Sequence, residues 1–431
     1  MKHLTRTSLG LLAAAGVAAA VAGCGSTPAP TKAAVDVAMM RGVATSEPAA
    51  DPRPLAAADT GFGLDVMRAW CGQNPGQNLV FSPSTLASAL GLAYLGAKGS
   101  TGTAMARVLD LPAGASRATL EAELAARMKA LGSLDGPGVT LAASDQVWAD
   151  PTVKTLGSYL NAVATGYHAG LAEAPFSSNP NQAADEINQA ISAATRGHIS
   201  QLVTADMLAG IGWVLTSALY LDAKWATPFE PNRTEPEPFA VPGAKPVTAK
   251  FMNGDAFPYA TAAGWQAVSL PYKGGRVTMT ALLPPAGSGS CALPSQAALA
   301  TMTGRLDGSR AGVANVSLPK VDLDTSGGVG DMKPTLEQLG MGVAFGGEAN
   351  FSGLSPQAGS IGFVQQAATL AVGEKGTVGA AAAAVGITAS AGEVPQPAVN
   401  VDFNRPYLLL ITAKATGEPL FLARVDNPTT R

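Results

Sequence analysis

Few side chains in this chain have the chemistry of a catalyst or a metal ligand. The 431 residues include three histidines and three cysteines. His3 falls in an apolar leader, whereas His168 and His198 lie on separate predicted elements with no cysteine or carboxylate at ligand spacing, so we expect no metal. The chain also lacks a G-x-S-x-G turn and a phosphate-binding glycine motif. We therefore expect neither an enzyme nor a cofactor.

The most unusual stretch is 372–394, which reads VGEKGTVGAAAAAVGITASAGEV. It contains five consecutive alanines, Ala380–Ala384, and no charge from Gly376 to Gly392. The glycines around the alanines weaken a helix, and the side chains are too small to build a core. Taken alone, the stretch is typical of a flexible linker. Small side chains at every second position would also let it enter a sheet between two existing strands.

Composition excludes some classes of partner. Of the residues, 47 % are hydrophobic and 14 % are charged, and the formal net charge is −3. This is enough apolar material for one large core. Lysine and arginine are not clustered in a stripe, so we expect no nucleic acid as a partner.

The amino terminus has the pattern of an export signal. Lys2 and Arg6 precede an apolar run, Leu9–Ala22, that is short for a membrane span. The sequence Val-Ala-Gly-Cys ending at Cys24 resembles a bacterial lipobox, which implies removal of residues 1–23 and lipid attachment to Cys24. An ordinary secretory signal with an incidental cysteine is the alternative. We expect an exported protein, lipid-anchored to the outer face of the bacterial cell membrane or secreted.

Residues 24–59 are rich in Ala, Pro, Ser and Thr and predict a disordered tether, which leaves 60–431 as a single domain. Helical periodicity is concentrated early in this domain and strand patterns follow it, without regular βαβ alternation, so the fold class is α+β. The predicted helices are 61–72, 85–95, 103–109, 118–131, 181–196 and 330–339. The predicted strands are 78–81, 139–148, 213–222, 247–251, 266–270, 276–283, 313–322, 361–372, 406–412 and 419–425.

Two cysteines remain in the domain, Cys71 and Cys291. Outside the cytoplasm they could form a disulfide, but sequence does not show whether they are near each other. Two buried free thiols are an equal alternative.

Several segments together resemble the serpin family. The similar segments, in chain order, are NLVFSPS at 78–84, LAYLGAKG at 92–99, TRGHIS at 195–200, LTSALY at 215–220, AKWATPF at 223–229, VSLPK at 316–320, NFSG at 350–353 and FNRPY at 403–407. Each motif alone is weak, but their common order from about Thr60 to Asn427 is specific.

The resemblance implies a serpin fold, with three β-sheets, about eight or nine helices and an exposed reactive loop. It implies a monomer that touches a membrane only through a lipid anchor. The family's hinge matches ten consecutive residues here: Glu374, Lys375, Gly376, Thr377, Val378, Gly379, Ala380, Ala381, Ala382 and Ala383.

The function implied is inhibition of serine endopeptidases, and also of cysteine proteases, by a suicide-substrate reaction. A protease cuts the loop, which then enters the main sheet as a new strand and traps the acyl-enzyme. The commonest loop length places the cut at Ser390–Ala391, while counting back from Asn404 places it near Pro395. No Lys or Arg lies between Lys375 and Arg405, so the expected target is elastase- or subtilisin-like, with a pocket for small or apolar side chains.

Other positions are carried over from the family. Lys320 and Glu374 match a pair that closes the top of the gap in the sheet. Ser82, Ser217 and Gln366 match a polar cluster at the sheet centre, where the family has serine, asparagine and histidine.

Two residues depart from the inhibitory pattern. Val378 stands where an acid is common, and Gly379 where alanine is preferred. Glycine is a poor strand former and can slow insertion. The alternative is therefore a substrate-like or non-inhibitory serpin that acts as a cell-surface binding protein.

Overall fold

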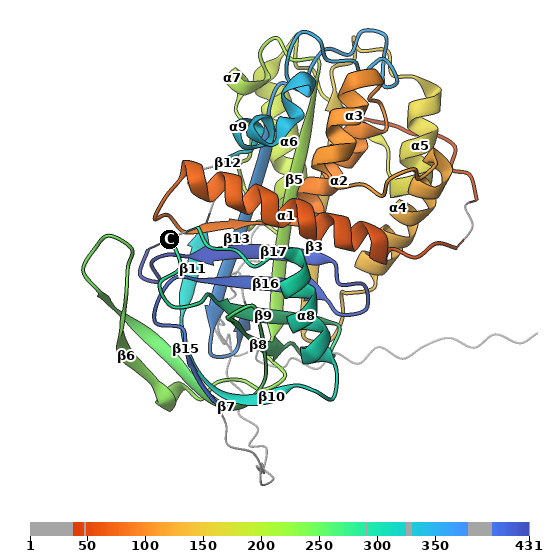
Figure 1. Cartoon of the computed structure of the whole chain (residues 1–431). Helices are drawn as coiled ribbons and strands as arrows, with labels where there is room; N and C mark the ends of the chain where they lie inside the picture. Colours follow the sequence, from red (N-terminus) through yellow and green to blue (C-terminus); the bar gives the residue numbers. More distant parts are fainter. Residues whose placement is uncertain (1–37, 47–48, 290, 325–329, 378–398, 431) are drawn as a thin grey trace, which may run out of the picture. The chain divides into compact units, whose positions relative to one another are not determined.

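The computed structural model describes residues 38–46, 49–289, 291–324, 330–377 and 399–430. Within them, no helix is both long and apolar enough to cross a membrane. Figure 1 shows long upright strands with helices packed at one end and a second, crossing sheet at the other.

The main sheet has eight strands, and its centre is formed by β5 and β13. The sequences of these strands are continuous apolar runs because both faces of the sheet are covered. Helix α6 covers one face, and α2 and the second sheet cover the other. In spatial order the strands are β1 (Met39–Met40), β4 (Leu171–Glu173), β3 (Val139–Ala149), β5 (Trp213–Lys224), β14 (Gly376–Thr377), β13 (Val364–Gly373) and β11 (Val321–Asp324), with β12 (Gly330–Asp331) also beside β13.

The second sheet has nine strands in one hydrogen-bonded network. The expectation of three separate sheets is thus wrong for the described residues, which form two. The reason is the 16-residue strand β7, Val247–Ala262, which pairs with β6 over residues 247–252, with β10 over 251–259 and with β8 over 259–262. The other strands are β6 (Thr234–Phe239), β8 (Trp265–Pro271), β9 (Val277–Leu283), β10 (Gly312–Pro319), β15 (Val399–Asp402), β16 (Tyr407–Ala413), β17 (Pro419–Val425) and β2 (Leu79–Phe81).

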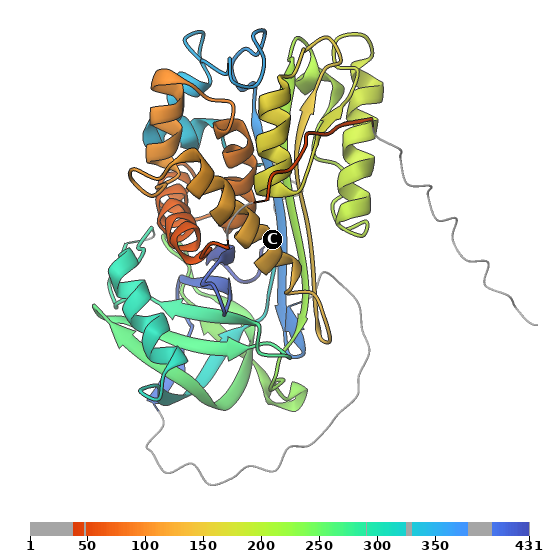
Figure 2. The ribbon, with the colours of Figure 1, turned by 90° about the vertical axis from the view of Figure 1, so that its right-hand side faces the viewer.

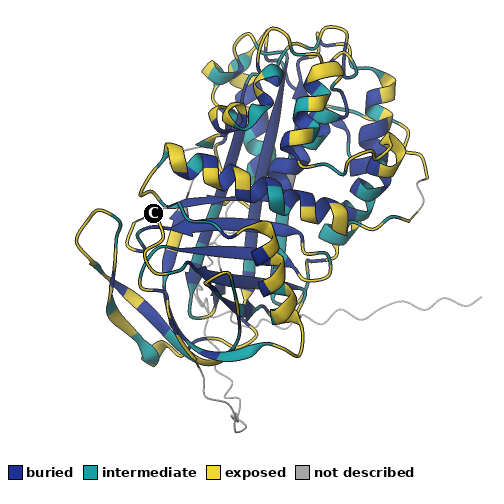
Figure 3. Ribbon diagram, in the orientation of Figure 1, coloured by how far each residue is buried: buried dark blue, intermediate teal, exposed yellow. Residues whose placement is uncertain are grey.

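Nine α-helices occur in the described chain, and α2 is the most deeply buried of the long ones (Figure 3). It begins at Pro83 after Ser82, whose side chain accepts a hydrogen bond from the Thr85 amide at 3.2 Å. The helices are α1 (Arg53–Gln73), α2 (Pro83–Tyr94), α3 (Gly99–Val108), α4 (Arg117–Gly132), α5 (Gly157–Tyr167), α6 (Pro180–Ala194), α7 (Ala205–Leu208), α8 (Gln296–Asp307) and α9 (Lys333–Leu336).

The ordered fold begins before residue 60. Helix α1 starts at Arg53, and Met39–Met40 pairs with β4 at the edge of the main sheet. The Val43 amide then donates to Asn161 on α5 at 2.8 Å, and Figure 2 shows this segment crossing that helix. The predicted tether 24–59 is therefore wrong over its described part, because backbone pairing and packing against α5 fix a segment of low hydrophobicity. Residues 1–37, including Cys24, lie outside the described residues.

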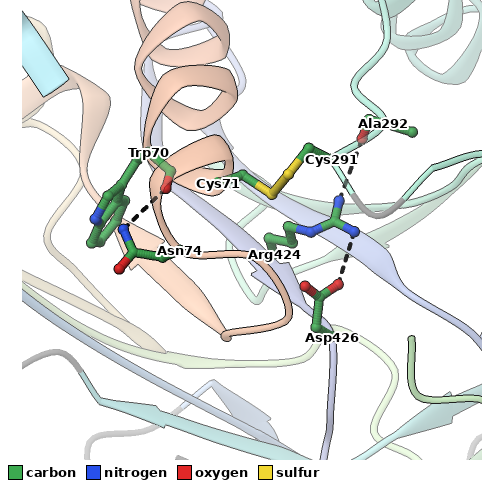
Figure 4. Close-up of a disulfide and its surroundings, with 7 residues drawn as sticks. All are labelled: Trp70, Cys71, Asn74, Cys291, Ala292, Arg424 and Asp426. Atoms are coloured by element: carbon green, nitrogen blue, oxygen red, sulfur yellow. Dashed lines mark hydrogen bonds and ion pairs between the residues drawn. A yellow bond between two sulfur atoms is a disulfide. The ribbon is translucent and has the colours of Figure 1, made fainter. Parts of the chain in front are cut away.

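Cys71 and Cys291 form a disulfide across 220 positions of sequence (Figure 4). It joins the end of α1 to the segment before α8. Nearby, the buried Arg424 guanidinium pairs with Asp426 at 2.8 Å.

Candidate functional site

The hinge strand β14 lies between β5 and β13, at the end of the main sheet where β13 finishes. After Gly373 the chain turns through Glu374 and Lys375 and then runs back beside β13. Gly376 and Thr377 pair with Lys224 and Ala223 of β5 as well as with Gly373 and Val372 of β13. The first two residues of the expected inserting strand are therefore already seated in the sheet.

Backbone and aromatic contacts hold this turn. The Trp225 amide donates to the Lys375 carbonyl at 3.0 Å, and the Phe229 amide donates to that of Glu374 at 2.8 Å. The Trp225 indole donates to the Gly373 carbonyl at 2.9 Å. Its ring stacks on Tyr272, whose hydroxyl lies 2.5 Å from the buried Thr377 hydroxyl. These contacts hold the turn and β14 in place.

The predicted pair Lys320–Glu374 is present. Lys320 Nζ lies 2.8 Å from Glu374 Oε2, and the Thr234 hydroxyl donates to Oε1 at 3.1 Å. Burial acts to raise the pKa of Glu374, but the hydrogen bonds from Lys320 and Thr234 outweigh it and lower the pKa overall. The ionised carboxylate thus ties β11, β6 and the hinge turn together.

Away from the hinge, toward the start of β13, strands β5 and β13 pair directly with each other. The parallel register joins Leu215–Leu219 to Val364–Ala368, and on the hinge side of this paired part β14 lies between the two strands. We call the directly paired part the seam, residues 215–219 with 364–368. A new strand that continued from Thr377 would have to separate it.

The structure also brings together Ser82, Ser217 and Gln366. Gln366 pairs with Ser217 across the seam, and its side-chain amide donates to the Ser82 carbonyl at 3.0 Å. Ser217 Oγ and Gln366 Oε1 are buried and have no hydrogen-bond partner among the described residues. The cluster therefore connects the seam to the start of α2 but is incompletely satisfied.

The other predicted site residues, Val378–Ala383, Ser390 and Ala391, lie outside the described residues. Sequence reasoning missed three partners of the hinge: Tyr272, Thr234 and the backbone of Phe229. Only their tertiary contacts assign them, since they come from distant strands and loops.

The strand order of the main sheet, with the two-residue strand β14 held between β5 and β13, can now be compared with known proteins. The family model described as Serpin (serine protease inhibitor) matches residues 57–428. The chain therefore belongs to the serpin family, whose members are protease inhibitors and not enzymes.

Relatives and solved structures agree with this. An uncharacterized serpin-like protein of Thermococcus kodakarensis is 30 % identical over 378 residues, covering 87 % of this chain and 86 % of its own. The Leukocyte elastase inhibitor of Sus scrofa is 28 % identical and covers 87 % of this chain and 99 % of its own. The thermophilic serpin tengpin in its native state superposes with a TM-score of 0.75 at 23 % identity, covering 91 % of this chain and 100 % of its own, which shows the shared fold.

Proposed function

We propose that this protein inhibits serine proteases by covalent trapping, with insertion of its cut loop into the main sheet. The observation that supports this most is the seating of Gly376 and Thr377 between β5 and β13. The strand that would be completed on insertion has already started in the correct place and direction.

Extending the observed register predicts where each later residue of the loop would lie after insertion into the sheet. Pairing of Thr377 with Ala223 and Val372 leads to Gly379 between Leu221 and Leu370. The same extension leads to Ala381 between Leu219 and Ala368, and to Ala383 between Ser217 and Gln366. These neighbours on β5 and β13 are all buried. Small uncharged side chains are what this face of the sheet can accept, because a buried unpaired charge costs several kcal/mol, or roughly 3–5.

The chemistry begins as ordinary proteolysis. The oxygen of the protease's serine bonds to the carbonyl carbon of the scissile peptide bond. The C–N bond then breaks, and the serine proton passes to the departing amine. The loop is then attached to the protease as an ester. Insertion pulls the ester away from the protease's catalytic groups before water can hydrolyse it.

Target choice follows from the loop sequence ITASA at 387–391, which is small and uncharged. A pocket for small or apolar side chains, as in elastase- or subtilisin-like proteases, is the best match. The similarity to a protein named Leukocyte elastase inhibitor supports the same target class.

Incubation with elastase and with subtilisin, followed by a denaturing gel, tests the proposal. A complex stable in SDS is expected, and a Gly379→Ala change should raise the ratio of complex to cleaved protein. Cleavage without complex but with a raised melting temperature would assign the substrate-like alternative. Cleavage without either would refute insertion.

We also propose that Cys24 carries a lipid that holds the protein at the outer face of the cell membrane. The lipobox-like sequence before Cys24 supports this. Partition of the expressed protein into a detergent phase, lost in a Cys24→Ser variant, is the expected result. Equal partition of both forms into the aqueous phase would favour simple secretion.

A further inference from the structure

A row of polar side chains crosses the middle of the main sheet. Asp145 on β3 is paired with Ser217 on β5, and Ser217 is paired across the seam with Gln366 on β13. Residues paired in this way point to the same face of a sheet. The row lies over α2, whose Ser88 hydroxyl adjoins Asp145.

This row holds buried polar atoms that make no hydrogen bond, although the hydroxyl of Ser217, which adjoins Asp145, is itself a donor. Asp145 Oδ1, Ser217 Oγ and Gln366 Oε1 are all buried without a hydrogen-bond partner among the described residues. Each such atom has lost its hydrogen bonds to water without gaining a partner in the protein, which disfavours the closed sheet. An ionised aspartate can only accept, whereas a protonated one also carries an O–H that can donate to a neighbour in the row. One proton therefore changes how well the closed sheet satisfies its polar groups.

Charged groups from the helical layer surround Asp145 but do not neutralise it. Arg127 on α4 is the cation that acts on it, and this guanidinium is already shared by Asp59 on α1 at 3.0 Å and Glu418 at 3.4 Å. Arg127 also donates to the Ser84 carbonyl at 2.7 Å and to the Ser88 hydroxyl. Two buried carboxylates thus claim this cation before Asp145 does.

The ionisable and hydroxyl groups that interact with Asp145 come from five elements. They are Arg127 (α4), Asp59 (α1), Tyr167 (α5), Ser88 (α2) and Ser217 (β5). Glu418, in the β16–β17 turn, acts on Asp59 and Arg127. Burial raises the pKa of Asp145 to about 7, although Arg127 and the hydroxyls of Ser217 and Ser88 act in the opposite direction.

Opening of the seam would break this row, since the inserting strand must separate Ser217 from Gln366. Parting the strands gives the carboxylate room and new partners, so the ionised form gains more from opening than the protonated form does. We propose that Asp145 is a positioning residue for insertion: with its proton it keeps the seam closed, and without it the seam opens more readily. The inference deepens the proposed function, because seam opening is the step that admits the loop.

The sign follows from linkage. Protonation favours the state in which the pKa is higher, which is the closed sheet. Stabilisation of the closed sheet is therefore complete at low pH and is lost as pH rises through about 7. If opening lowers the pKa by one unit, the opening equilibrium changes by up to about tenfold.

Hydrogen exchange of the full chain measures this opening without any protease. Amides in 215–221 and 364–370 are followed at pH 6 and pH 8.5, and rates are corrected for intrinsic exchange. For wild type we expect the opening equilibrium to rise about three- to tenfold between the two values. Asp145→Asn keeps the shape of the side chain but not its charge. At both pH values this variant should show the opening equilibrium that wild type has at pH 6. Asp145→Ser serves the same purpose if the asparagine variant folds poorly.

Asp185→Asn is the matched control, since Asp185 is an exposed aspartate on α6 outside the row. It should keep the wild-type dependence on pH. The inference is overturned if Asp145→Asn retains that dependence or if wild type has none. Hydrogen exchange does not measure inhibition, so a negative result for Asp145 leaves the proposed function to be tested by the SDS-stable complex. Absence of the complex would likewise leave the pH dependence of seam opening to be tested by exchange.

Discussion

Gly376 shows how much one residue decides at the hinge. Its φ is +155°, and a Cβ at this position would lie 2.1 Å from the Ala223 carbonyl oxygen. Any side chain would push β14 away from β5, so Gly376→Ala should unseat the hinge and cost roughly 1–3 kcal/mol of unfolding free energy. Urea unfolding and the rate of limited proteolysis within 374–377 measure the two effects.

The control for this change is Gly347→Ala, where a Cβ would have open space around it. It should leave both measurements unchanged. If Gly376→Ala behaves like Gly347→Ala, the seated hinge is not a feature of the protein in solution.

Single residues differed in how far sequence could assign them. Lys320 and Glu374 were predicted as a pair because local motifs on both sides fix their positions, and the structure places them 2.8 Å apart. The buried group around Arg127 was not predicted. Its members are distant in sequence, and buried charges run against the usual pattern of composition.

At the scale of elements, the turn between β13 and β14 depends on an ionised Glu374. Its pKa is lowered from 4.5, since hydrogen bonds from Lys320 and Thr234 outweigh burial. A lowered pKa contributes stability above the unfolded value, and this is lost as pH falls below about 4.5. Lys320 is 39 % exposed, so the effect should stay below about 1 kcal/mol.

Urea unfolding at pH 7 and pH 3.5 tests this. Glu374→Gln should be less stable than wild type at pH 7, and the difference should shrink at pH 3.5 as Glu374 of wild type takes up a proton. Glu337→Gln, at an exposed position, should match wild type throughout. A constant difference between Glu374→Gln and wild type at both pH values would argue against the ionic contribution.

The disulfide joins two further elements, the end of α1 and the segment before α8. Because it closes a long stretch of chain, it restricts the unfolded state. Its loss should cost about 2–5 kcal/mol. The Cys71→Ser, Cys291→Ser double variant should unfold at lower urea, and reduction of wild type should give a similar shift. No shift in either case would mean that the bond does not form in the protein.

Long strands were easier to predict than short ones. Apolar runs such as Trp213–Lys224 are unambiguous, while the short strands β1, β4 and β6 and the helices α5 and α8 were not predicted. The pairing of Cys71 with Cys291 and the position of β14 depend on tertiary proximity. Neither has a local signal in the sequence.

At the scale of the whole molecule, insertion requires that alternate loop residues face opposite sides of the sheet. Extension of the observed register on insertion would place residue 381 between Leu219 and Ala368, both fully buried, and residue 378 between Asp222 and Ala371, both partly exposed. A glutamate at 381 would have to be buried without a partner, whereas one at 378 would reach water.

We therefore expect wild type and Val378→Glu to gain a large increase in melting temperature after a single cut in the loop, and Ala381→Glu to gain little. The uncut proteins should melt alike, since neither substituted position belongs to the described strand β14, which comprises Gly376 and Thr377. The same order should appear in the yield of SDS-stable complex, because both depend on completing the strand. If both glutamate variants gained equal stability, the strand would enter in another register. If neither the variants nor wild type gained any, the energy of the native sheet would not be released by cleavage, and the seated hinge would be an end state rather than the start of insertion.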